Sequence, residues 1–70
     1  MEGLQGLALY NLACLFANFH LPEKSIELLK RSIAKGFVAL EAFRRDPDLY
    51  PLHGKPEFEK LMKELEVNNV

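Results

Sequence analysis

Apolar residues recur along the chain at the spacing of three and four positions that is typical of helices. No segment alternates between apolar and polar residues over a useful length, so the sequence predicts an all-α fold. The first helix is expected over residues 4–19 and is apolar on nearly every side; its large apolar residues are Leu7, Leu9, Leu12, Leu15, Phe16 and Phe19. A helix of this composition is expected to be buried on more than one side.

The second predicted helix begins at Pro22 and ends near Gly36. Proline suits a first turn because its missing N–H has no intrahelical partner there, and glycine readily adopts the left-handed conformation that ends helices. One apolar stripe runs along this helix and consists of Ile26, Leu29 and Ile33. We therefore expect an antiparallel helical hairpin, with Phe37 folded back onto its end.

Shorter helices are predicted beyond the hairpin. A third helix is expected over residues 38–45, with Leu40 and Phe43 facing inward. Asp46 precedes Pro47 and is expected to cap a new turn that ends at Gly54.

The last predicted helix begins around Pro56 and has a regular apolar face. That face consists of Phe58, Leu61, Met62 and Leu65, at the spacing of one helical side. Residues 66–70 are expected to fray, as chain ends commonly do.

Large and small residues follow a fixed spacing through the first two predicted helices. They are Leu9, Leu12-Ala13, Phe16, Ser25, Leu29 and Ser32, followed by Phe37. This spacing resembles one tetratricopeptide repeat (TPR), a 34-residue helix–turn–helix unit, with Phe37 in place of the usual proline and His20 at the joint where the family often has glycine. The resemblance implies an α-solenoid fragment.

Small residues in this pattern are expected where the two helices cross closely, at Ala13, Ser25 and Ser32. The space between the helices is expected to be filled by Leu12, Phe16 and Leu29. The two serine hydroxyls are expected to bond back to a carbonyl one turn earlier in their own helix.

Two later segments, DPDLYPL at 46–52 and KPEFEKL at 55–61, resemble a C-terminal cap common in bacterial proteins of this family. The chain is therefore expected to be a single domain over residues 1–70: a repeat at 6–39, capping helices at 40–66 and a frayed tail at 67–70. A repeat buries its apolar face against a neighbour. The first helix is thus expected to be covered by more of a longer protein, a second copy or a partner.

The TPR resemblance also implies a function. In this family the first helix of each repeat lines a concave groove that binds proteins or peptides. Carried over to this chain, the groove-facing residues are Leu7, Tyr10, Asn11, Cys14, Ala17 and Asn18, with Glu41, Arg44 and Arg45 from the third helix. We expect a non-catalytic interaction module or scaffold that binds a peptide or helix there. The alternative is a structural element that self-assembles through its apolar first helix.

Some TPR proteins clamp the C-terminal carboxylate of a peptide. Asn11 and Arg45 match two positions of that clamp, but Glu41 stands where a lysine is expected and would repel the carboxylate. Structural roles are the alternative for these residues: a backbone hydrogen bond for Asn11, and ion pairs of Glu41 with Arg44 and Arg45. Likewise, Tyr10 can be half-buried packing and Cys14 a small apolar filler.

Charge and composition argue against other function classes. The net charge of −1 provides no field to attract nucleic acid or an anionic membrane. The apolar stretch 7–19 is shorter than the roughly 18 residues of a membrane span, and no basic start precedes it. The single cysteine excludes an internal disulfide, so a cytoplasmic location is expected.

Enzyme and metal functions are not expected. Cys14 and His20 are six residues apart, which places them about 240° apart around a helix of 3.6 residues per turn. They therefore cannot form a local nucleophile–base pair. Together with His53 they match no zinc-ligand spacing. No glycine-rich phosphate loop is present either, and no cofactor is expected.

Overall fold

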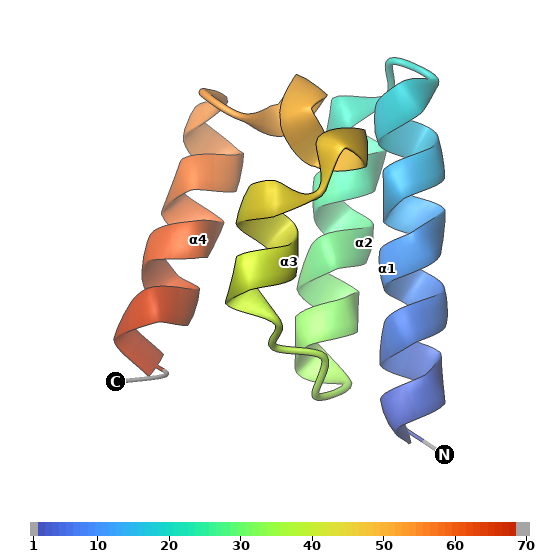
Figure 1. Cartoon of the computed structure of the whole chain (residues 1–70), viewed down its shortest axis with the longest axis vertical. Helices are drawn as coiled ribbons and strands as arrows, with labels where there is room; N and C mark the ends of the chain where they lie inside the picture. The colour runs from blue at the N-terminus through green and yellow to red at the C-terminus, as the bar shows by residue number, and fades with distance from the viewer. Residues whose placement is uncertain (1, 69–70) are drawn as a thin grey trace.

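The computed structural model describes residues 2–68, which are helical apart from short joints and contain no strand. The elements are α1 (Glu2–Asn18), α2 (Pro22–Ala34), α3 (Leu40–Arg45), the 3-10 helix η1 (Pro47–Leu52) and α4 (Pro56–Asn68). The predicted all-α fold, with a helical hairpin followed by shorter helices, is confirmed. In Figure 1, α1 and α2 run antiparallel, α3 lies between α2 and α4, and η1 lies near the joint of the hairpin.

Small residues allow α1 and α2 to pack closely. Ala13, Ser25 and Ser32 are completely buried where the two helices meet. The Ser25 hydroxyl donates to the Ala13 carbonyl oxygen and the Ser32 hydroxyl to that of Gly6, each over 2.6 Å. The expected bonds within α2 are therefore wrong: both hydroxyls reach across to the other helix, because its backbone lies close enough to accept them.

Gly6 marks the tightest approach of α1 to the end of the hairpin. A Cβ atom there would lie 2.8 Å from Cβ of Phe37 and 3.2 Å from the carbonyl oxygen of Ser32. Cβ atoms essentially never come within 3.0 Å of a non-bonded heavy atom of another part of the chain. Gly6 is thus required for this packing, a role that the sequence pattern did not predict.

The space between the two helices is filled differently from the prediction. Leu29 is fully buried as expected, but Phe16 is only half-buried and Leu12 is exposed. The prediction for Leu12 is wrong because α1 is apolar all round, while α2 covers only one of its sides. The buried residues of α1 are, besides Gly6, Tyr10, Ala13, Cys14 and Ala17.

Left-handed residues end both helices of the hairpin. Gly36 has a φ of 97°, and the N–H of Phe37 donates to the carbonyl oxygen of Ser32 over 3.1 Å, so the predicted fold-back of Phe37 is confirmed. At the joint between α1 and α2, His20 has a φ of 62°. A residue with a Cβ is strained in this conformation, which explains why glycine would suit the position.

The C-terminal part closes the core. As predicted, Asp46 caps η1, because its carboxylate accepts from the N–H of Asp48 over 2.9 Å. The expected inward residues of α3 and α4 are confirmed for Phe43, Phe58, Leu61, Met62 and Leu65, while Leu40 is only partly buried. The helix α4 extends to Asn68, and residues 69 and 70 lie outside the described part, so the expected fraying of residues 66–70 stays a prediction.

Within residues 2–68, none of the helices combines the length and the apolar character that crossing a membrane demands.

The close approach at Gly6 gives a stability prediction. We expect Gly6→Ala to lower the free energy of unfolding by about 1–3 kcal/mol, because the added methyl group overpacks the contact with Phe37. In an uncrowded helix the same change would raise stability by up to about 1 kcal/mol. Urea unfolding followed by circular dichroism measures the difference, and Asn11→Ala on the exposed side of α1 is the control. An unchanged or increased stability of Gly6→Ala would contradict the packing described.

Candidate interaction surface on the first helix

The three sides of α1 have different surroundings. One side packs against α2, and a second is covered by η1 and the residues that precede it. The third side faces solvent. The predicted site residues are distributed over the last two sides, so each side is described in turn.

An aromatic cluster occupies the position of the predicted groove. The ring of Tyr10 lies 5.0 Å from that of Phe37 and 5.4 Å from that of Phe43, and the latter two rings are 5.9 Å apart. These are normal separations for aromatic packing. The chain itself therefore fills the space beside Tyr10 that a partner was expected to enter.

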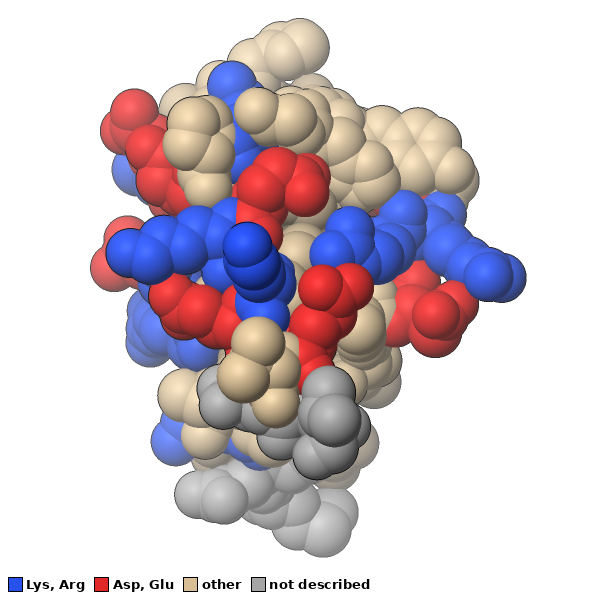
Figure 2. All heavy atoms as spheres, turned by 90° about the vertical axis from the view of Figure 1, so that its left-hand side faces the viewer, with Lys and Arg blue, Asp and Glu red and all other residues tan. Residues whose placement is uncertain are grey.

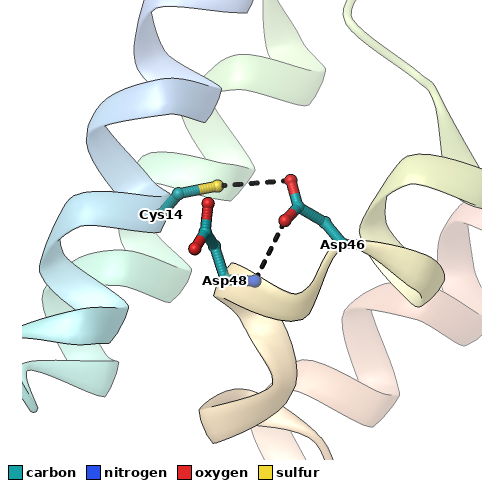
Figure 3. A group of neighbouring side chains, drawn as sticks. All are labelled: Cys14, Asp46 and Asp48. Carbon is teal, nitrogen blue, oxygen red and sulfur yellow. Dashed lines mark hydrogen bonds between the residues drawn. The ribbon is translucent and has the colours of Figure 1, made fainter.

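Asp46 connects the covered side of α1 to the beginning of η1. Its carboxylate accepts hydrogen bonds from the hydroxyl of Tyr10 and, over 3.8 Å, from the thiol of Cys14. Figure 3 shows the Cys14 thiol directed at Asp46, whose other oxygen caps η1 through the N–H of Asp48. One carboxylate thus anchors η1 against α1 while capping it.

Burial and the nearby carboxylate keep both partners of Asp46 protonated. Burial raises the pKa of Cys14 to about 11, and the negative charge of Asp46 acts in the same direction. The pKa of Tyr10 is raised far above its usual range, mainly by burial and further by the hydrogen bond to Asp46. A thiol and a phenol in this state donate hydrogen bonds and are poor nucleophiles.

Cys14, Asp46 and Asp48 also place one potential metal ligand each within 4.8 Å of one another. Soft thiolate and hard carboxylate ligands prefer different metal ions, however, and a metal would have to displace the proton of a thiol with a pKa of about 11. The hydrogen bonds that Asp46 accepts from Cys14 and from the N–H of Asp48 explain why these three residues lie together, as an anchor between α1 and η1.

The structure brings together only part of the predicted groove. Tyr10 and Cys14 are each 6% exposed and Ala17 is buried, so the expectation that these side chains face a partner is wrong. The cause is the segment from Phe37 to Leu52, which folds over this side of α1. For Tyr10 and Cys14, the packing roles considered as alternatives describe the structure better.

Other predicted site residues remain accessible at the edges of this cover. Leu7, Asn11 and Asn18 are exposed on α1. The side-chain amide of Asn18 donates to the Cys14 carbonyl oxygen and to the carboxylate of Asp48, both over 3.1 Å. Asn18 thus also ties α1 to η1.

The charged residues of α3 form ion pairs. Arg45 pairs with Glu41 over 2.9 Å, as predicted for an i, i+4 pair on a solvated helix face. Arg44 instead pairs with Glu66 of α4, also over 2.9 Å. The predicted pairing of Arg44 with Glu41 is therefore not the one that forms.

The solvent-exposed side of α1 carries an apolar face that the predicted groove did not include. Its large side chains are between 40% and 63% exposed, and the face consists of Leu4, Ala8, Leu12, Leu15 and Phe19. We call these five residues the α1 face. From residue 3 to residue 19 the sequence contains no charged side chain, so α1 contributes no charge to the α1 face.

The side of the molecule formed by α4 has the opposite character. Figure 2 shows Lys and Arg side chains interspersed with Asp and Glu across this side. A depression of about 170 Å³ between α2 and α4 is lined by Lys30, Glu57, Lys60, Leu61 and Glu64. Its volume is below the roughly 300–1,000 Å³ of small-molecule sites, and charges of both signs line it.

The chain matches no family model, and neither the curated proteins nor the solved structures contain a match to it.

The bond between Tyr10 and Asp46 gives a second prediction. Tyr10→Phe keeps the ring packing but leaves the partly buried carboxylate of Asp46 without one donor, which should lower the free energy of unfolding by about 1.5–3 kcal/mol. Tyr50→Phe is the matched control because Tyr50 is exposed, and it should change stability by less than about 0.5 kcal/mol. Chemical denaturation of the three proteins measures the difference. If Tyr10→Phe were as stable as the unchanged protein, the hydrogen bond from Tyr10 to Asp46 would not be stabilising.

The state of Cys14 gives a third prediction. Because thiolate is the reactive form, alkylation of the native protein by iodoacetamide should keep accelerating up to about pH 11. The raised pKa also means that the stability contributed by the protonated thiol is complete below the pKa of an unfolded cysteine, about 8.5. It is then lost as the pH rises towards 11. Cys14→Ser, which keeps a donor but does not titrate there, should lose less stability over this interval. A rate that levels off near pH 8.5 would contradict the prediction.

Proposed function

We propose that this chain is a non-catalytic protein–protein interaction module that binds an apolar helix of a partner on the α1 face. The observation that carries the proposal is the exposure of this face, whose large side chains are 40–63% accessible on one side of a single helix. Contiguous exposed apolar patches on small proteins mark sites of interaction with other proteins. The binding surface differs from the predicted groove, because that groove is filled by Phe37 and Phe43.

The form of the α1 face favours a helix as the partner. Leu4 and Phe19 are 15 residues apart, which corresponds to about 22 Å along a helix with a rise of 1.5 Å per residue. Apolar side chains at intervals of three and four residues interdigitate with the same pattern on another helix. An extended strand would need unpaired backbone groups along this surface, and α1 has used its own within the helix.

The accessible part of the predicted site lies at the border of the α1 face. Asn11 and Asn18 flank the apolar residues, and Leu7 extends them towards the covered side. The side-chain amide of Asn11 and the amide oxygen of Asn18 can bond to polar groups at the edge of a bound helix, while the Asn18 nitrogen already donates to Cys14 and Asp48. Glu41, Arg44 and Arg45 lie beyond this border on α3, and we keep them in the proposal only as a polar rim.

We further propose that the hairpin is a TPR-like unit and that the protein works in the cytoplasm. The burial of Ala13, Ser25 and Ser32 at the helix crossing supports the first point, because the resemblance requires small residues there. The single, protonated Cys14 is compatible with a reducing compartment.

Titration with a helical peptide tests the proposed function. The probe is a synthetic helix with leucine and alanine on one side and both charge signs on the other. Backbone amide shifts should change mainly along α1, at Leu12, Leu15 and Phe19. Leu12→Lys should weaken binding at least about tenfold, since it removes apolar burial and places a charge in the contact.

Val38→Lys is the control for this titration, because Val38 is 44% exposed, like Leu12 at 40%, but lies outside α1. Shift changes concentrated at the depression between α2 and α4, with none along α1, would disprove the proposed surface.

A further inference from the structure

The α1 face has a symmetry that the proposed function does not require. Four of its five residues pair with one another about a point between positions 11 and 12, and Leu12 pairs with its neighbour Asn11, so that the two numbers of each pair add up to 23. The pairs are Leu4 with Phe19, Ala8 with Leu15, and Asn11 with Leu12, bordered by the two amides Gln5 and Asn18. All eight residues are exposed. The turn after α1 keeps Phe19 in line with the helix, because its N–H still donates to the carbonyl oxygen of Leu15 over 3.1 Å.

This pairing has a geometrical meaning. Successive residues of a helix are rotated by about 100°, so residues whose numbers have a constant sum lie symmetrically about one line on its surface. Ala8 and Leu15 lie within about 10° of that line and Leu4 and Phe19 within about 30°, by the same helical rotation. A two-fold axis that is perpendicular to the helix and crosses this line between positions 11 and 12 maps the α1 face onto that of an antiparallel copy.

The side chains are complementary under that rotation. The small Ala8 of one chain comes opposite the large Leu15 of the other, which lets the helices approach closely. Leu4 comes opposite Phe19 at each end, and Gln5 opposite Asn18 along each border. Antiparallel helices also align their dipoles favourably.

The charge distribution favours the same occupant. A second copy brings each surface residue near a chemically identical surface, which is unfavourable where that surface carries net charge. Between residues 3 and 19 the sequence has no charged residue, so the copy meets no like charge there. The α4 side, with its many charges, offers no such match.

We propose that the α1 face binds the α1 face of a second copy, forming an antiparallel two-fold dimer in which residues with numbers adding up to 23 meet. This inference rests on the proposed function of the α1 face and names its partner. A single pair of helices of about 22 Å is a small contact, so the dimer is weak and forms reversibly.

The first experiment measures association of the whole chain. Sedimentation equilibrium and amide shifts should show a monomer–dimer equilibrium as the concentration rises to about 1 mM, the range expected of small interfaces. Ala8→Glu and Leu15→Lys should each weaken the dimer at least tenfold. The double variant should recover most of that loss, because the two introduced charges face each other only between antiparallel copies and are seven residues apart within one chain.

The second experiment tests the register by disulfide formation, in a Cys14→Ser background. A mixture of the Ala8→Cys and Leu15→Cys variants should give a crosslinked heterodimer under mild oxidation. Each variant alone should give little product, because its cysteines are about 10 Å out of register along the helix, beyond disulfide reach. Circular dichroism checks that every variant remains folded.

The outcomes separate the two proposals. A chain that stays monomeric at 1 mM, with shifts independent of concentration, overturns the dimer; peptide binding along α1 then still supports the proposed function. If the chain neither dimerises nor binds the peptide along α1, both the dimer and the proposed function are overturned. A dimer that is insensitive to Leu15→Lys, or that crosslinks each variant to itself as parallel helices would, also overturns the inferred arrangement.

Discussion

The close crossing of α1 and α2 is the constraint on which the rest of the structure depends. Two serine hydroxyls of α2 bond to the backbone of α1 over 2.6 Å, and Gly6 leaves no room for a Cβ atom. This approach fixes the rotation of α1 about its axis, because the small residues and the hydroxyl acceptors must face α2. The rotation in turn decides that Tyr10 and Cys14 point towards η1 and that the α1 face points to solvent.

Asp46 fixes the second side of α1. Its carboxylate receives donors from Tyr10 and Cys14 and at the same time caps η1. A short 3-10 helix has little stability of its own, so its position depends on this anchor and on the buried side chains of Leu49 and Leu52. The cost is that the groove expected beside Tyr10 is filled from within. The side of α1 that neither α2 nor η1 covers is therefore the one that stays exposed.

The sequence allowed the helices, their caps and the inward faces of α3 and α4 to be predicted, because proline, glycine and regular apolar stripes determine them locally. The orientation of α1 could not be predicted in the same way. With apolar residues on every side, its periodicity does not distinguish Leu12, which is exposed, from Ala13, which is buried. The bonds from Tyr10 and Cys14 to Asp46 also join residues 36 and 32 positions apart, respectively, and nothing local in either segment indicates them.

The apolar α1 face has consequences for the stability of the fold. A chain of 70 residues buries a smaller fraction of its surface than a larger domain and is only marginally stable. Leaving leucine and phenylalanine side chains in water forgoes roughly 25 cal/mol per Å² of apolar area that another surface could bury. Any protein that binds this face in the folded state alone stabilises the fold by mass action. Because α1 is the helix against which both α2 and η1 pack, occupancy of its remaining side stabilises the element that organises the whole domain.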